Sequence, residues 1–288
     1  MPAQDIPPTP GDRIWLITGA SSGFGRTLAE AALAAGDTVV AAVRRPAALA
    51  DEAAAHPGRL VPVALDVADT ARAAEVVAEV VDRFGRIDVL VNNAGRGLVG
   101  AVEETSDAEL RDLMDLHFFG PAALVRAVLP HMRAQKSGAV VQMSSMGGRL
   151  SFPGVGAYSA TKFALEGLTE ALAGEVAAHG ITCLIVEPGA FRTGFAGAGA
   201  LQSTATVLPA YEDTVGGVRT GLSDSDGTQP GDPVRAAEAI LTALDADHTP
   251  LRLALGDDAV DAIRAHADAE RAELNAWEDV SRSTAYDA

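Results

Sequence analysis

The chain has 288 residues and a formal charge of −17, the balance of 22 basic and 39 acidic side chains. This excess of acid argues against nucleic acid or an anionic membrane surface as a partner. The single cysteine, Cys183, excludes an intrachain disulfide. Residues 1–12 lack the pattern of a secretory signal, and no stretch of about 18 apolar residues indicates a membrane span. We therefore expect a cytoplasmic protein with a short flexible leader over residues 1–12.

Short apolar runs alternate with helical patterns from residue 13 to about residue 255, without an interior linker or repeat. This alternation predicts a single α/β domain built on a parallel sheet. Residues 190–232 are rich in Gly, Ser, Thr and Asp and show no regular pattern, which is typical of a substrate lid. Residues 256–288 form an acidic extension with apolar side chains at helical spacing, so we expect a helix that docks on the body or contacts another subunit.

A glycine-rich turn follows the first apolar run. Residues 13–18 read RIWLIT, residues 18–25 read TGASSGFG, and an alanine-rich helical pattern comes next. In such a strand–turn–helix unit, glycines allow the backbone to approach a pyrophosphate, and the helix N-terminus supplies free N–H groups. The spacing of Gly19, Gly23 and Gly25 therefore predicts a dinucleotide site, with a plain structural turn as the alternative.

The second predicted strand, residues 37–43, is followed by Arg44 and Arg45. In a dinucleotide-binding fold this strand end lies beside the adenosine ribose, where an acidic residue would bind the 2′-hydroxyl of NAD. Arginine instead pairs with phosphate through two parallel hydrogen bonds. The two arginines predict a preference for NADP(H) over NAD(H), and the alternative is that they are ordinary surface charges.

Polar residues also follow the third and fourth predicted strands. The third ends in Asp66 and Val67, and the fourth leads into residues 92–95, Asn-Asn-Ala-Gly. Because ligands of open α/β sheets bind at the carboxyl ends of the strands, we expect both turns to line the cofactor site.

A helix is predicted after the fourth strand, because Ser106 and Glu109 form a capping-box pattern. It should run to about Arg133, with an interruption near Gly120 and Pro121.

The candidate catalytic residues lie further along the chain. Tyr158 and Lys162 are four residues apart, so in a helix they share one face. An ammonium beside a phenol favours the phenolate, so we expect Lys162 to lower the pKa of Tyr158 towards working pH. Such a phenol gives a proton to a carbonyl or takes one from an alcohol. Ser145, at the end of a predicted strand, would hold the substrate oxygen beside it. The alternative for Lys162 is a solvated lysine on an ordinary helix.

Taken in order, these segments resemble the short-chain dehydrogenase/reductase family. The resemblance covers roughly residues 13–255 and rests on TGASSGFG, LDV with Asp66, NNAG, Ser145, Tyr158 with Lys162, and PGAFRT at residues 188–193. It implies one Rossmann-type, doubly wound domain with about seven parallel strands. It also implies oxidoreductase chemistry between a ketone or aldehyde and the alcohol, in which the cofactor carries the hydride.

The resemblance further implies a role for each motif residue. Tyr158 would be the acid/base, Ser145 the oxyanion partner, and Lys162 the residue that binds the nicotinamide ribose. The remaining cofactor contacts would come from Gly19, Ser21, Gly23, Phe24 and Gly25 around the phosphates and ribose, from Asp66 and Val67 beside the adenine, from Asn93, Ala94 and Gly95 along the cofactor, and from Pro188, Gly189 and Thr193 at the nicotinamide end.

One residue departs from the family pattern. His117 stands where the family usually has an asparagine that supports a water linking the lysine to solvent. The backbone carbonyl at this position would still hold that water, and a neutral imidazole, both donor and acceptor, would be able to join the proton relay. The other interpretations are a packing histidine with the relay unharmed, and impaired redox chemistry.

The second half of the chain is most similar to the hydroxysteroid- and retinol-dehydrogenase-like branch, which implies a bulky, largely apolar carbonyl or alcohol as substrate. Ordinary core or lid packing is the alternative for each apolar pocket candidate, and Arg96 would face either an anionic group or solvent. The candidate pocket residues are Arg96, Leu98, Arg149, Leu150, Phe152, Val155, Phe191 and Phe195.

Two other functions remain compatible with these residues. One is an epimerase or dehydratase that uses the cofactor without net redox change, and the other is a non-catalytic NADP sensor. No metal site is expected. By analogy with the family, the helices expected at about 107–133 and 157–178 would pair two copies, giving a homodimer or homotetramer.

Overall fold

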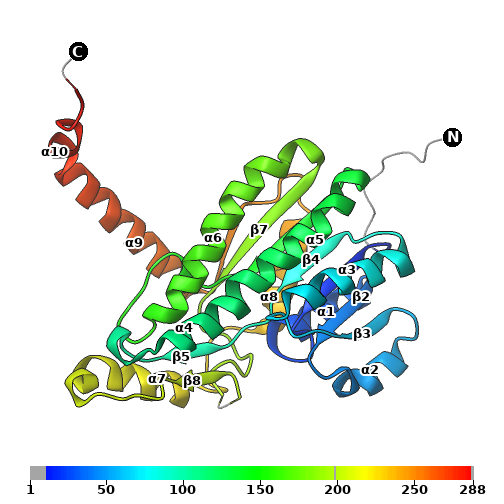
Figure 1. Cartoon of the computed structure of the whole chain (residues 1–288), viewed down its shortest axis with the longest axis horizontal. Coiled ribbons are helices and arrows are strands. Elements are labelled where there is room, and N and C mark those ends of the chain that lie inside the picture. Colours follow the sequence, from blue (N-terminus) through cyan, green and yellow to red (C-terminus); the bar gives the residue numbers. More distant parts are fainter. Residues whose placement is uncertain (1–10, 198, 287–288) are drawn as a thin grey trace.

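The protein is described here by a computed structural model that covers residues 11–197 and 199–286 (Figure 1). Of the predicted leader, residues 1–10 lie outside the described residues. The centre is a parallel sheet of seven strands in the order β3-β2-β1-β4-β6-β7-β9, which confirms the predicted α/β fold. The strands are β1 (Ile14–Thr18), β2 (Thr38–Val43), β3 (Leu60–Ala64), β4 (Val89–Asn92), β6 (Gly138–Met143), β7 (Ile181–Pro188) and β9 (Arg252–Leu255).

The strand order reverses at the centre of the sheet. The chain builds outwards from β1 through β2 to β3, and then returns to place β4 on the other side of β1. Leu16 of β1 therefore lies between Val40 of β2 and Leu90 of β4, and all three are buried. A crevice for a ligand is expected at the carboxyl ends of β1 and β4, where the order reverses.

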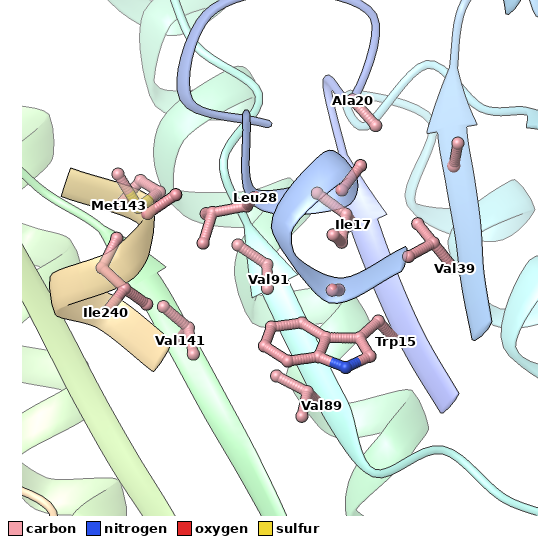
Figure 2. Close-up of a cluster of buried hydrophobic side chains, with 14 of the residues drawn as sticks. Trp15, Ile17, Ala20, Leu28, Val39, Val89, Val91, Val141, Met143 and Ile240 are labelled. Atoms are coloured by element: carbon pink, nitrogen blue, oxygen red, sulfur yellow. The ribbon is translucent and has the colours of Figure 1, made fainter. Parts of the chain in front are cut away.

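Helices cover both faces of the sheet. On one face α1 (Gly23–Ala34) packs against α8 (Pro233–Leu244), and on the other lie α3 (Thr70–Phe84), α5 (Gly120–Gln135) and α6 (Gly156–Val176). Figure 2 shows Leu28 of α1 close to Val91 of β4, and Ile240 of α8 close to Val141 of β6. Each such side chain, fully buried, contributes about 1.5–3 kcal/mol to stability. The short helix α2 (Ala50–Ala55) lies beside β3.

The helix predicted after Ser106 is confirmed. At the start of α4 (Asp107–Met114), the Ser106 N–H donates to the Glu109 carboxylate at 2.9 Å, and the Glu109 N–H donates to the Ser106 hydroxyl at 3.3 Å. The predicted interruption is a π-helical turn, Asp115–Phe119, that joins α4 to α5 without a break. There the Gly120 N–H bonds to the Asp115 carbonyl, five residues earlier, and Pro121 has no N–H to restore the regular ladder.

Residues 107–135 together are long and apolar enough to span a membrane by length and composition alone, the only such stretch among the described residues. Half of its apolar 18-residue window is buried in the protein, and α5 packs against α3 and the sheet. A core helix of a globular fold has the same composition, so the observation does not identify a membrane segment.

The segment predicted to be irregular, residues 190–232, contains regular structure, and in this respect the prediction is wrong. Strand β8 (Leu201–Ser203) pairs in parallel with β5 (Gly97–Val99), and α7 (Gly217–Asp224) follows a second π turn, Glu212–Gly216. These elements enclose a small core of their own around Val99, Ala101 and Val215. The elements are only three to eight residues long and rich in Gly and Thr, so they leave little periodic signal in the sequence.

Carboxylates anchor this segment to the body. Glu104, which is buried, accepts hydrogen bonds from the Leu208 N–H at 2.7 Å and from the Arg219 guanidinium at 2.9 Å. Glu109 accepts a hydrogen bond from the Ala205 N–H at 2.8 Å. These contacts hold the segment over the carboxyl end of the sheet. The remaining single turns are Pro46–Leu49, Val102–Glu104, Met146–Gly148, Ala177–His179 and Pro209–Tyr211.

The acidic extension is helical, as its spacing predicts. It consists of α9 (Asp257–Ala276) and α10 (Glu278–Arg282). The first turn of α9 packs through Ala259, but the rest of the helix projects away from the body (Figure 1), and Leu274 and Trp277 are exposed. The predicted docking role of this extension therefore stays a prediction.

Candidate active site

The glycine-rich turn forms a tight cradle between β1 and α1. Gly19 and Gly23 have φ values of 66° and 52°, in the left-handed region that favours glycine. A Cβ at Gly25 would lie 2.4 Å from the Asn93 side-chain nitrogen and 2.5 Å from the Gly19 carbonyl oxygen. The first turn of α1 carries no acidic residue and Ser22 makes no side-chain cap. The turn therefore presents uncapped backbone N–H groups and a positive helix end, a good fit for a pyrophosphate.

Thr18 joins the glycine turn to the Asn-Asn-Ala-Gly turn. Its hydroxyl accepts hydrogen bonds from the N–H groups of Asn93 at 2.9 Å and Ala94 at 3.0 Å. The Asn93 side chain donates back to the Thr18 carbonyl at 2.8 Å. Sequence reasoning did not identify Thr18 as a site residue, although a polar residue that closes an apolar strand was a usable signal.

The remaining predicted adenosine contacts lie at neighbouring strand ends. Arg44 and Arg45 are exposed directly after β2, and neither side chain has an ion-pair partner among the described residues. Asp66 accepts a hydrogen bond from the Ala68 N–H at 3.1 Å, and Val67 is buried. Ser21 is exposed in the glycine turn. The two arginines are thus available to an anionic ligand.

The three candidate catalytic residues meet at the start of α6. Tyr158 and Lys162 lie on its first two turns, and the Lys162 ammonium is 5.7 Å from the centre of the Tyr158 ring. The ammonium donates to the Met143 carbonyl, at the end of β6, at 2.7 Å. The Ser145 hydroxyl accepts a hydrogen bond from the Gly147 N–H at 3.0 Å. Ser145 and Tyr158 both face Gly147, because a Cβ there would lie 3.3 Å from the Ser145 hydroxyl oxygen and 3.4 Å from the Tyr158 ring. A substrate oxygen beside Ser145 and Tyr158 would thus meet two hydroxyl groups.

The predicted lowering of the tyrosine pKa is wrong for this structure. Burial raises the pKa of Tyr158 to about 12, because it penalises the phenolate, while the hydrogen bond with Ser145 acts in the opposite direction. Burial also lowers the pKa of Lys162 to about 8, although the nearby Glu166 carboxylate favours the ammonium. The four-residue spacing gave the proximity of the two groups correctly, but it carried no information about burial.

His117 is buried in the π turn between α4 and α5. Its ring lies edge-on to the Tyr158 ring, with the centroids 5.6 Å apart. Its two nitrogens contact Thr161 of α6 and the backbone of Arg96. Thr161 is a second site residue that sequence reasoning missed. A threonine inside a predicted helix carries no signal that distinguishes it from an ordinary helix residue.

The segment after β7 contributes two residues to the site. Thr193 lies against the glycine turn, where its carbonyl oxygen would be 3.0 Å from a Cβ at Gly23. Phe195 lies beside Tyr158, with the two ring centroids 5.9 Å apart. At the end of β7, Pro188 is buried, and the Gly189 N–H donates to the Leu255 carbonyl at 3.0 Å.

Two of the pocket candidates have packing or ion-pair contacts within the protein. Phe191 is buried in the core between the sheet and α1, with its ring 5.1 Å from that of Phe24, which is the packing contact that the sequence left open as the alternative. The Arg149 guanidinium pairs with Glu187 at 3.4 Å. The other candidates fall into two groups: buried Leu98 and Val155, and the more exposed Arg96, Leu150 and Phe152.

A buried acidic pair, Glu166 and Glu187, lies beneath the loop that follows β6. Glu166 of α6 accepts a hydrogen bond from the Ser144 hydroxyl at 2.6 Å, and Glu187 of β7 lies 3.4 Å from Arg252, which also contacts Glu166 at 3.3 Å. Gly148 makes this approach possible, because a Cβ there would lie 2.2 Å from the Glu166 carboxylate. Burial and the neighbouring Glu166 raise the pKa of Glu187 to about 7.

We expect Glu187→Gln to flatten the pH dependence of stability. The folded protein holds the Glu187 proton more tightly than the unfolded chain does, so the wild type loses stability as the pH rises from 4.5 to about 7. This loss is about 3 kcal/mol at most, and the Gln variant should escape it. Urea unfolding at pH 5 and pH 8 measures the difference. Glu170→Gln, at an exposed partner of the same arginine, is the control; if both variants retain the wild-type pH dependence, Glu187 is not protonated near neutral pH.

The seven-stranded parallel sheet, the glycine cradle at the strand-order reversal and the Ser145, Tyr158 and Lys162 cluster define a nicotinamide-dependent oxidoreductase of the Rossmann type. Among the described residues no group of His, Cys, Asp and Glu is placed to hold a metal ion. The chain belongs to the short-chain dehydrogenase/reductase family: the family model described as short chain dehydrogenase matches residues 13–202.

Comparisons with individual proteins agree. The chain is 38% identical to an oxidoreductase of Botryotinia fuckeliana named BOA17, over 95% of this chain and 99% of that one. A crystal structure of a short-chain dehydrogenase from Streptomyces avermitilis is 58% identical, covers 96% of this chain and all of its own, and superposes with a TM-score of 0.91. A Burkholderia phymatum short-chain dehydrogenase/reductase in complex with NAD is 26% identical, over 91% of this chain and 96% of that one, with a TM-score of 0.79.

Proposed function

We propose that this protein is a cytoplasmic, NADP(H)-dependent oxidoreductase that interconverts a ketone or aldehyde and the corresponding alcohol. The observation that carries the proposal is the approach of Ser145 and Tyr158 around Gly147, beside the Lys162 ammonium, at the carboxyl edge of a sheet whose glycine turn fits a pyrophosphate. The uncapped N–H groups at the start of α1 are the structural reason for expecting a cofactor there.

In carbonyl reduction, Tyr158 would donate its phenolic proton to the substrate oxygen while Ser145 donates a second hydrogen bond. The raised pKa of Tyr158, about 12, keeps the phenol protonated and ready to donate at neutral pH. The Lys162 ammonium then stabilises the negative charge that develops on the phenol. The bound nicotinamide supplies or takes the hydride.

The preference for NADP(H) is supported by Arg44 and Arg45. Both are exposed at the β2 end of the cofactor crevice without an ion-pair partner among the described residues, although the chain as a whole is strongly acidic. A phosphate on the ribose 2′-position would give these guanidinium groups a bidentate anionic partner.

We expect the double variant Arg44→Ser, Arg45→Ser to bind NADPH about 10–100-fold more weakly and NADH with little change, because a charge-assisted hydrogen bond contributes about 1.5–3 kcal/mol. Fluorescence titration with both nucleotides measures the change. Arg264→Ser, at an exposed arginine on α9, should leave both affinities unaltered. Equal weakening of NADPH and NADH by the double variant would mean that the arginines do not recognise the 2′-phosphate.

The activity itself is tested by NADPH oxidation with a panel of ketones and aldehydes of increasing apolar bulk. Phe195 beside Tyr158, together with Leu150 and Phe152, supports a largely apolar substrate. Oxidation of NADPH by bulky apolar carbonyls is the expected result. Tight NADPH binding with no oxidation across the panel would contradict the reductase assignment.

We also propose that the protein is a homodimer or homotetramer. Phe119 after α4 and Phe163 on α6 are large apolar side chains with about half of their surface exposed, at 48% and 47%. Apolar side chains on these two helices support the expected pairing of copies. Sedimentation analysis of the purified protein tests it, and a monomer at micromolar concentration would overturn it.

A further inference from the structure

The π turn aims His117 into the active site. Because Asp115 bonds to the N–H of Gly120, five residues later, the helix carries an extra residue at this point, and the His117 side chain turns inward until it is 1% exposed. Gly95 leaves room for the imidazole, since a Cβ there would lie 3.1 Å from Nε2. The histidine is therefore seated between the loop after β4 and helix α6.

The hydrogen bonds of the ring determine its protonation state. The backbone N–H of Arg96 donates to Nε2 at 3.1 Å, so Nε2 carries no proton. The Thr161 hydroxyl lies 2.9 Å from Nδ1, and it donates its one hydrogen to the Tyr158 carbonyl at 2.7 Å. That hydroxyl can only accept from His117, so the proton is on Nδ1. The neutral tautomer with its proton on Nδ1 therefore satisfies every contact. In an imidazolium, Nε2 would also carry a proton and would face the Arg96 N–H, so that two donors would meet.

The surrounding charges act in the same direction. Lys162 on α6 and Arg96 on the loop after β4 are both cationic, and the other titratable group beside the ring is the Tyr158 phenol. Burial, and next to it these two cations, hold the pKa of His117 well below its ordinary value of 6.5. The imidazole is thus neutral across the working pH range.

We propose that His117 is a positioning residue, a neutral link that joins the cofactor loop at Arg96 to the catalytic helix through Thr161, and that it does not carry protons. The link runs from the Arg96 N–H through both imidazole nitrogens and the Thr161 hydroxyl to the backbone of Tyr158. It sets the tyrosine against the loop that lines the cofactor. This inference rests on the proposed role of Tyr158, and it replaces both the relay and the packing interpretations of His117 with a positioning role.

The first test is spectroscopic and needs no turnover. Nitrogen-15 NMR of the imidazole side chains, with His117→Asn to assign the resonance, should show His117 as the Nδ1–H tautomer with no titration between pH 5.5 and 8.5. The chain has six histidines, so the other five provide internal references that include exposed rings. Titration of His117 in this range, or a proton on Nε2, would overturn the proposal.

The second test is kinetic and uses the Thr161 end of the link. His117→Gln keeps an acceptor near Arg96 but loses the contact with Thr161, and Thr161→Val removes the same contact from the other side. Each should lower kcat about 10–100-fold, because small displacements of a catalytic group have effects of this size. The affinity for NADPH should change little. Thr161→Ser, which keeps the hydroxyl, should restore activity close to that of the wild type.

The pattern of these variants distinguishes a positioning residue from a relay. If both changes break one link, the double variant should be no slower than the slower single variant, and its kcat against pH should keep the wild-type shape. Additive losses, an altered pH profile, or recovery of His117→Gln by added imidazole would overturn the proposal. If the wild type shows no carbonyl turnover, the proposed function fails, whereas the tautomer measurement still decides the state of His117.

Discussion

Replacing Tyr158 by Phe is expected to lower kcat/KM for carbonyl reduction by about 10²–10⁴-fold, the usual contribution of a positioned general acid. The buried Tyr158 phenol is the proton donor on the side of Gly147 that Ser145 also faces. Phe keeps the ring, and with it the edge-on contact to His117 and the contact to Phe195. The change should therefore remove the proton donor without disturbing the packing around it.

The affinity for NADPH distinguishes a variant that has lost only the proton donor from one whose cofactor site is disrupted. In the Phe variant, fluorescence titration should give an NADPH Kd within about threefold of the wild type, since threefold corresponds to only about 0.6 kcal/mol. The matched control is Tyr286→Phe, at a tyrosine that is fully exposed on the C-terminal extension. Wild-type turnover in Tyr158→Phe would exclude the tyrosine as the acid.

The second large effect concerns Lys162. We expect kcat/KM for reduction to fall as the pH rises through about 8, because the pKa of Lys162 is lowered to about 8 by burial and the ammonium is lost above it. Below this pH the charge that stabilises the phenolate is present. Lys162→Met should lower kcat/KM by about 10²-fold or more at pH 7 and should lack the alkaline limb.

Two control variants test the origin of this alkaline limb: one keeps a positive charge at position 162, and the other removes a lysine elsewhere in the chain. Lys162→Arg keeps a charge that is not lost at this pH, so whatever activity it retains should extend to higher pH than in the wild type. Lys136→Met, at the only other lysine of the chain, should preserve both the rate and the limb. An alkaline limb that persists in Lys162→Met would assign it to another group.

The buried acidic pair, Glu166 and Glu187, affects the stability of the fold and also contacts residues next to the candidate catalytic groups. Glu166 accepts a hydrogen bond from the Ser144 hydroxyl, next to Ser145, and lies one helical turn after Lys162, whose ammonium it favours. Glu187 is the second-last residue of β7, the strand that ends at Pro188 and leads into Gly189. Arg149 and Arg252 balance the charge of the pair, so Arg149 supports the scaffold of the site, and its place in the substrate pocket stays a prediction.

Much of the architecture could be predicted from local patterns. Alternating apolar strands and helical periods predicted the parallel sheet, and the capping box at Ser106 predicted the start of α4. Tyr158 and Lys162 were placed on one helix face by their spacing alone. These features depend on residues close together in the chain, so their signal is present in the sequence.

The lid was predicted less well, because its structure depends on distant partners. Strand β8 forms by pairing with β5, about a hundred residues earlier, and Glu104 and Glu109 hold the backbone at Leu208 and Ala205. Three-residue strands and single turns have no period to detect. Its role as a substrate lid stays a prediction.

The sequence by itself determined the fold class, the family resemblance and the identities of Ser145, Tyr158 and Lys162, because ordered motifs and short-range spacing are properties of the linear chain. Only the tertiary structure decided the direction of the Tyr158 pKa and the tautomer of His117. Both depend on burial and on hydrogen bonds between segments far apart in the chain. Desolvation and donor–acceptor geometry are properties of the packed molecule, and no spacing in the sequence encodes them directly.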